Sequence, residues 1–93
     1  YAAAFAGVEG MHMVAEPAGR HSNYWLQTLA LDEAHAGYRD QILGATNDAG
    51  LMTRPVWHLM HRLQPYSSAP CSPVPVAESL ERRLLNLPSS AGL

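Results

Sequence analysis

The sequence predicts an α+β fold: a small two-layer sandwich in which a short antiparallel or mixed sheet is covered by helices. Two observations support this. Apolar, aromatic and β-branched residues fill two stretches typical of strands, 23–31 and 51–57, and apolar residues recur at helical spacing in two others, 36–49 and 76–87. Their order lacks the regular β-α alternation of a parallel α/β fold.

The composition limits the size and class of the protein. The chain has 93 residues, 47% of them hydrophobic and 15% charged, which suits one small domain and is too apolar for disorder. No apolar run approaches the roughly 18 residues of a membrane span, and a net charge of −2 offers no basic patch for nucleic acid or an anionic membrane. So few charges predict that apolar surface faces a missing partner.

The first third of the chain predicts strands more than helix. Its opening residues, YAAAF, are interpreted as the tail of a helix that begins upstream, stopped by Gly7 and Gly10. Residues 11–16 alternate well enough for a short strand, and Pro17 begins a turn. The stretch 23–31 is apolar on both alternating faces, which favours a central strand covered on both sides.

A helix over 36–49 is predicted next, with Asp32 as its N-cap and Gly50 as the glycine that follows its last turn. The stretch 51–57 favours a strand, but Pro55 has no N–H to donate and places it at a sheet edge. Residues 58–63 suit one helical turn, and the proline-rich 64–75 suits a loop. A second helix over 76–87 begins near Pro75 and ends before Pro88.

The chain contains six arginines and no lysine, so it cannot form a lysine Schiff base. Cys71 is the only cysteine and cannot form an internal disulfide. We interpret it as a loop thiol in a reducing, cytoplasmic setting.

Three stretches in fixed order carry a family resemblance: SNYWLQTLALD at 22–32, RDQILGATNDAGLMTRPVWHLMH at 39–61, and AESLERRLLNLPSS at 77–90. Together they resemble the carboxy-terminal small-domain region of the DegT/DnrJ/StrS-type aminotransferases, which act on nucleotide-linked keto-sugars. The resemblance covers roughly residues 14–90. Within that family, NYWLQTLALD and TRPVWHLMH look most like enzymes that aminate UDP- or GDP-linked 4-keto-6-deoxy sugars.

The resemblance implies that the chain is a fragment of a larger enzyme that depends on pyridoxal phosphate (PLP). The missing large domain would supply the lysine that holds PLP and its other binding groups, so this chain alone should bind no cofactor and be inactive. The region is expected to cover the active site and to pack against the large domain and a second subunit of a homo-oligomer. A related subgroup dehydrates sugars, and these residues do not decide between the two reactions.

Five residues match the family motifs and are predicted to contact the nucleotide-sugar: Asn23, Tyr24, Arg54, Trp57 and His61. The guanidinium of Arg54, held extended before a proline, suits a phosphate, and the indole of Trp57 suits stacking on a base or sugar. Structural alternatives stay open: an Arg54 paired with a carboxylate, a Trp57 or Tyr24 in the core, and an Asn23 that makes a turn.

His58 and His61 are three residues apart and would share a helix face, but two ligands without a nearby carboxylate do not predict a metal site. They are interpreted as exposed or hydrogen-bonded histidines, with His61 also a candidate for a substrate contact. The rival to the enzyme hypothesis is a free-standing α+β module, not an enzyme, that binds a partner or itself. The parent reading frame would discriminate between the two.

Overall fold

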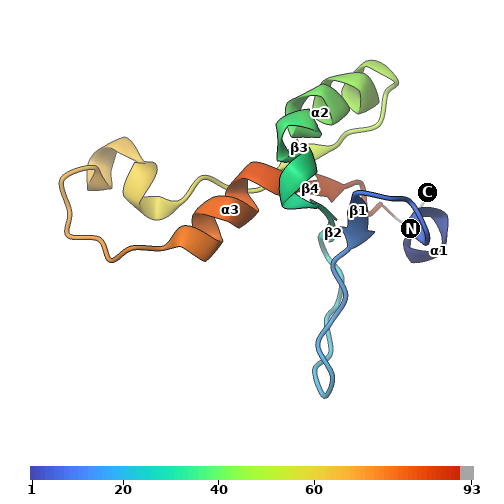
Figure 1. The fold of residues 1–93 in the computed structure, drawn as a ribbon, viewed down its shortest axis with the longest axis horizontal. Coiled ribbons are helices and arrows are strands. Elements are labelled where there is room, and N and C mark those ends of the chain that lie inside the picture. The colour runs from blue at the N-terminus through green and yellow to red at the C-terminus, as the bar shows by residue number, and fades with distance from the viewer. Residues whose placement is uncertain (91–93) are drawn as a thin grey trace.

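The computed structural model describes residues 1–90, which form a four-stranded sheet with three α-helices and three short 3₁₀ helices (Figure 1). In chain order these elements are α1 (Ala2–Phe5), β1 (Met11–Met13), β2 (Gln27–Leu31), η1 (Glu33–Tyr38), α2 (Arg39–Asp48), β3 (Arg54–Pro55), η2 (Met60–Arg62), η3 (Gln64–Tyr66), α3 (Pro75–Arg83) and β4 (Leu84–Leu87).

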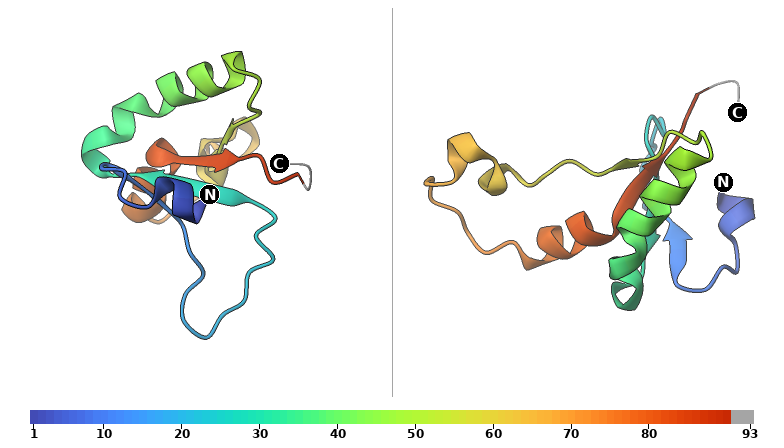
Figure 2. Two further views of the ribbon diagram at one scale, coloured as in Figure 1. Left: turned by 90° about the vertical axis from the view of Figure 1, so that its right-hand side faces the viewer. Right: turned by 90° about the horizontal axis from the view of Figure 1, so that it is seen from above.

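The sheet is antiparallel throughout, with the strand order β1-β2-β4-β3. Strand β2 pairs with β1 through Leu31 opposite Met11, and with β4 through Leu29 opposite Leu85. Helix α2 lies over one face of the sheet, and α3 runs directly into β4 (Figure 2). The predicted α+β fold with an antiparallel sheet is therefore confirmed.

The predicted helix over 76–87 is wrong in its last third, residues 84–87. Helix α3 ends at Arg83, and Leu84 has an extended backbone with φ −97° and ψ 144°. The next four residues, LLNL, form the strand that joins β2 to β3. A short apolar run fits both a buried strand and a helix face, and pairing on both sides makes it a strand here.

The predicted strands exist but are shorter than expected. The 11–16 strand stops at Met13, the 23–31 strand begins only at Gln27, and the 51–57 strand is reduced to Arg54 and Pro55. At 22–25 the side chains of Ser22 and Asn23 accept hydrogen bonds from backbone N–H groups two residues ahead, which replaces the sheet ladder.

The predicted 36–49 helix is divided. Residues 33–38 form a 3₁₀ helix, and the α-helix begins only at Arg39. Asp32 does stand at the N-cap position, but of the 3₁₀ helix and not of the α-helix, and its carboxylate makes no capping hydrogen bond; its backbone carbonyl accepts from His35 N–H at 2.9 Å. Gly50 follows the helix in the left-handed region, φ 82°, as predicted for a glycine at this position.

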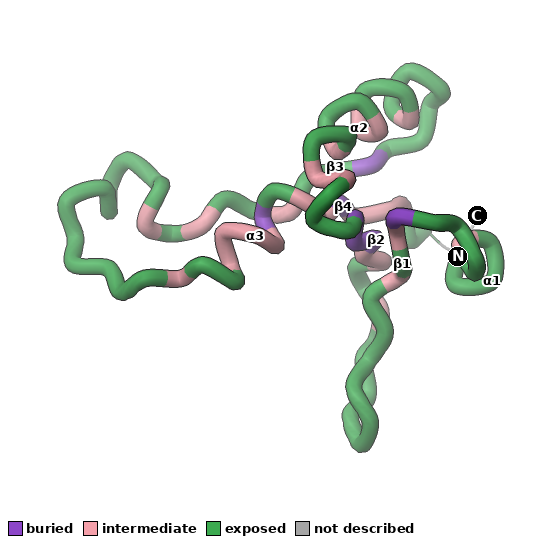
Figure 3. The backbone as a smooth tube through the Cα atoms, viewed as in Figure 1, coloured by how far each residue is buried: buried purple, intermediate pink, exposed green. Residues whose placement is uncertain are grey.

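The core is small for the length of the chain (Figure 3). Its buried apolar residues are Leu29, Ala30 and Leu31 of β2 and Leu85 of β4. The accessible surface is 6940 Å², whereas a compact monomer of 10.1 kDa exposes about 5,300 Å². The radius of gyration, 14.8 Å, likewise exceeds the roughly 12 Å of a compact domain of this length.

Two extensions account for this excess (Figures 1 and 2). One is the 14–26 loop, which connects β1 to β2 and projects away from the sheet. The other, called the arm here, comprises residues 56–74 and runs out from β3 and back to α3. Among residues 1–90, no helix is both long and apolar enough to cross a membrane.

Candidate functional site

The five predicted contact residues fall into three places. Asn23 and Tyr24 lie at the base of the 14–26 loop, Arg54 lies on the edge strand β3, and Trp57 and His61 lie on the arm. Asn23 and Tyr24 line one concavity and His61 lines another. The described part of the chain therefore does not join all five into one pocket.

The first concavity, of about 790 Å³, is formed by segments from both ends of the described chain. The Tyr1 hydroxyl donates a hydrogen bond to the carbonyl of Pro88 at 2.7 Å, and the Ser89 hydroxyl donates to the carbonyl of Trp25 at 2.7 Å. These bonds attach the base of the 14–26 loop to the segment after β4. Asn23 and Tyr24 are thereby held in a formed, polar-lined hollow.

Tyr24 has a strained backbone that its neighbours fix. Its φ of 48° lies in the left-handed region, which costs a residue with a Cβ about 1–2 kcal/mol. Its N–H donates to the Ser22 hydroxyl at 3.0 Å, its carbonyl accepts from the Gln27 amide at 3.2 Å, and its hydroxyl accepts from the N–H of Glu16 at 3.0 Å. Strain of this kind is often found at functional sites.

Asn23 makes the turn that the alternative interpretation expected, because its Oδ1 accepts from Trp25 N–H at 3.1 Å. Its side-chain amide group makes no hydrogen bond to residues 1–90. One residue can thus shape the turn and still present two donors to a ligand.

Arg54 carries a charge that no carboxylate within residues 1–90 neutralises through an ion pair. Its Nη1 donates to Asn47 Oδ1 at 3.2 Å and to the carbonyl of Thr53 at 3.1 Å, both neutral acceptors. Asn47 is itself held by Thr53, whose buried hydroxyl accepts from Asn47 Nδ2 at 2.9 Å. The guanidinium is therefore oriented but still available to an anion.

The arm exposes Trp57 and partly covers His61. Trp57 is 78% exposed, so the alternative interpretation of a core tryptophan does not apply within this chain. The His61 side chain is 26% exposed and its Nε2 lies 3.5 Å from Glu78 Oε1. His61 also lines an apolar concavity of about 430 Å³ with Met60 and Tyr66.

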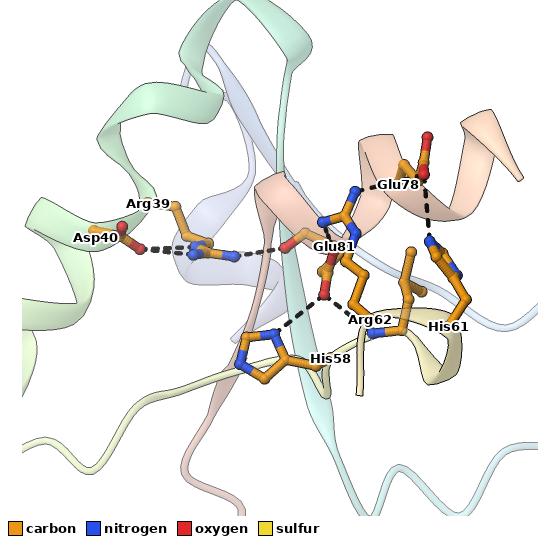
Figure 4. Close-up of polar contacts among 8 residues, drawn as sticks. Arg39, Asp40, His58, His61, Arg62, Glu78 and Glu81 are labelled. Atoms are coloured by element: carbon orange, nitrogen blue, oxygen red, sulfur yellow. Dashed lines mark hydrogen bonds and ion pairs between the residues drawn. The ribbon is translucent and has the colours of Figure 1, made fainter. Parts of the chain in front are cut away.

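A buried carboxylate joins the arm to α3 (Figure 4). The side chain of Glu81 is 7% exposed, and its Oε1 accepts from Leu59 N–H at 3.1 Å while His58 Nδ1 lies 3.3 Å away. Its Oε2 accepts from Arg62 Nη1, and its backbone carbonyl accepts from Arg39 at 2.6 Å. Glu81 thus connects the arm, α3 and the start of α2.

Burial raises the pKa of the Glu81 carboxyl, since it disfavours the charged form. The Leu59 N–H, the hydrogen bond to His58 and the positive charges of Arg62 and His58 together outweigh that effect, so the pKa of Glu81 is lowered from 4.5. The carboxylate is therefore charged at neutral pH.

Sequence reasoning did not single out Glu81. The sequence offered one signal: Glu81 follows Leu80 and stands shortly before the apolar run 84–87, so its side chain could be buried. A carboxylate is buried only when other polar groups pair with it. The partners come from the arm, 19 to 23 residues earlier, and no local pattern indicates them. No group of three or more metal-ligating side chains occurs in residues 1–90.

Comparison with known proteins shows what the fold is similar to. The solved structures that match it include DesI in the presence of its TDP-sugar product, with a TM-score of 0.87 and 26% identity over 99% of this chain. They also include the aminotransferase TlmJ from Streptoalloteichus hindustanus, with a TM-score of 0.79 and 26% identity over 95%. The chain covers 24% and 23% of those two proteins.

Two GDP-perosamine synthases are similar in sequence. The one from Caulobacter vibrioides is 37% identical over 75 residues, which are 81% of this chain, and the one from Vibrio cholerae is 30% identical over 94 residues, which cover 100% of it. The chain spans only 20% and 25% of their lengths. The model of the DegT/DnrJ/EryC1/StrS aminotransferase family matches residues 1–93. The chain therefore belongs to the DegT/DnrJ/EryC1/StrS aminotransferase family.

Proposed function

We propose that this chain is the carboxy-terminal small-domain region of a larger PLP-dependent aminotransferase that aminates a nucleotide-linked keto-sugar. The main support is that the family model matches the whole chain, while the chain covers only 20% to 25% of the length of its relatives. The large accessible surface supports the same proposal, because a region that packs on a missing domain leaves that surface uncovered.

The residues of this chain do not by themselves fit PLP. No lysine is present in the sequence, so the amine that would hold the cofactor comes from elsewhere in the larger enzyme. When bound, PLP supplies the electron sink that amino-group transfer needs. The contribution proposed for this chain is to bind and orient the substrate and to exclude water from the active site.

Arg54 is proposed to bind the diphosphate of the nucleotide-sugar, because its guanidinium is oriented by neutral groups and has no carboxylate partner within residues 1–90. Trp57 is proposed to stack on the base or sugar, since its indole is exposed. Asn23, Tyr24 and His61 would supply polar contacts. The names of the two similar synthases favour a GDP-linked sugar over a UDP-linked one.

The partners that follow are the large domain of the same enzyme and a second subunit of a homo-oligomer. They would cover the exposed side chains of the arm and the 14–26 loop, among which Trp57, Met60 and Trp25 are each more than half exposed. The exposed free thiol of Cys71 suits a reducing cytoplasm.

The test uses the full-length enzyme encoded by the parent reading frame, loaded with PLP and supplied with amino acids as candidate amino donors. Incubation with GDP-linked and UDP-linked 4-keto-6-deoxy sugars should give the amino-sugar with the GDP compound. The 93-residue chain alone should give no product and no absorbance band that borohydride makes permanent. A product from the short chain, or a full-length protein that dehydrates both sugars instead, would contradict the proposal.

A further inference from the structure

We infer that Glu81 is a positioning residue: its buried carboxylate holds residues 58–62 of the arm in one conformation and so sets the place of Trp57 and His61. This inference rests on the proposed function, in which those two side chains contact the substrate. Glu81 itself would touch neither the substrate nor the cofactor.

The Glu81 carboxylate contacts the arm at three residues, His58, Leu59 and Arg62, and this set of contacts is called the clamp here. Oε1 of Glu81 accepts from the backbone N–H of Leu59 at 3.1 Å and lies 3.3 Å from His58 Nδ1, while Oε2 accepts from the Arg62 guanidinium. The attachment at Leu59 is to the backbone, so it fixes the path of the chain and not only a side chain. Trp57 lies two residues before this point and His61 two residues after it.

The arm has little else to fix it there. Met60 is 64% exposed and Leu63 36% exposed, and Leu59 is only partly buried, so apolar burial near the clamp is small. The single turn of η2 is closed by two hydrogen bonds, from Arg62 N–H to Leu59 O at 2.9 Å and from Leu63 N–H to Met60 O at 3.1 Å. A turn this short is unstable without tertiary support.

The surrounding charges make the clamp specific to Glu81. Glu78, one turn earlier on α3, lies 3.5 Å from both Arg62 Nη2 and His61 Nε2 but is 38% exposed. Solvent screens those longer contacts, whereas Glu81 is 7% exposed and screened less. On the other side of α3, Arg39 donates to the Glu81 carbonyl and not to its carboxylate.

Amide hydrogen exchange in the full-length enzyme tests the clamp directly. Glu81→Ala should speed exchange at residues 58–63 by about 10- to 100-fold, as expected when charge-assisted hydrogen bonds are lost. Glu81→Gln keeps an acceptor for Leu59 N–H and should give a smaller increase. Glu78→Gln should change the exchange rates of residues 58–63 by less than about threefold. Glu9→Gln is the matched control, because it removes an exposed carboxylate away from the arm, and it should have an equally small effect.

The expected pattern is local: residues 58–63 change while the amides of β2 and β4 do not. Unchanged exchange in the Glu81 variants, or an equal rise in the sheet, would overturn the inference, because the residue would then be dispensable or merely structural. If Glu81→Ala fails to fold, Glu81→Gln gives the same comparison.

Kinetics supply the second measurement. In the active enzyme, Glu81→Gln should raise the substrate KM at least about threefold with little change in kcat, because ordering the contact residues contributes to binding. An unchanged KM with a fallen kcat would overturn the positioning role. A full-length protein without aminotransferase activity would refute the proposed function, while the exchange pattern would still decide whether Glu81 clamps the arm.

Discussion

Different forces hold two regions of the molecule in place: the pair of strands β2 and β4, and the arm. Between the strands, Leu29 packs opposite Leu85 in a ladder of backbone hydrogen bonds, and Leu31 and Leu85 are fully buried. In the arm, Trp57 and Met60 are mostly exposed, and the closest links to the rest of the chain are polar contacts to Glu81. The first region is stabilised by its own packing, whereas the second lacks the contacts that would cover it.

This difference indicates that the two regions have different roles. A sheet whose two central strands supply the buried core can act as a fixed base, and an arm with exposed aromatic side chains is suited to contacts outside these residues. Changes in the sheet should therefore alter stability, and changes in the arm should alter binding. The following predictions test that division.

Leu85→Ala should have the largest effect. It removes a side chain of zero exposure from a core to which residues 1–90 contribute four buried apolar residues, and such truncations cost about 2–5 kcal/mol in free energy of unfolding. Met60→Ala on the arm is the matched control and should cost less than about 0.5 kcal/mol. Denaturant unfolding of both variants measures the contrast, and similar losses would show that the arm is as much a part of the core as β4.

The isolated 93-residue chain should self-associate. Its accessible surface exceeds that of a compact monomer by about 1,600 Å², as much as a typical specific interface buries in total. Sedimentation velocity over a range of concentrations should show dimers or larger species. A clean monomer at high concentration would support the rival view of a module that is complete in itself.

Acid should weaken the link between the arm and α3. The folded-state pKa of Glu81 is lowered below 4.5, so its contribution to stability is present above about pH 4.5 and is lost as pH falls through the lowered value. Glu81→Gln should remove that part of the acid sensitivity. The melting temperature of the variant should therefore fall less steeply as pH decreases below about pH 4.5. The same slope in both proteins would show that other carboxylates cause the acid loss.

Arg54→Ala should have the smallest effect on stability and a clear effect on binding. Within residues 1–90 its guanidinium donates only to neutral groups, so the loss should stay under about 1 kcal/mol, while the KM of the full-length enzyme for its nucleotide-sugar should rise. Arg82→Ala, an exposed arginine on α3, is the control and should change neither. A large loss of stability with unchanged KM would make Arg54 a structural residue instead.

The sequence predicted the kinds of element better than their ends. Periodicity and Gly50 located α2 near its true end, and the aromatic stretch indicated β2. The LLNL segment was misassigned because its strand conformation depends on β2 and β3, which lie 30 to 60 residues earlier. The candidate side chains were chosen because they match the family motifs, with local chemistry as support. The role of Glu81 stayed hidden, since its partners are on another segment and burial is not visible in a single sequence.

The place of β4 in the sheet has a consequence for how the protein is made. Among the strands of residues 1–90 it comes last in sequence order, yet it lies between β2 and β3 in the sheet. Chains are synthesised from the amino terminus at about 5–20 residues per second, and strands distant in sequence pair slowly. While Leu84–Leu87 is still inside the ribosome, a nascent chain can form the β1–β2 pair of this sheet but not the β2–β4 pair. The inner edge of β2 is then exposed, with a risk of wrong pairing until β4 emerges.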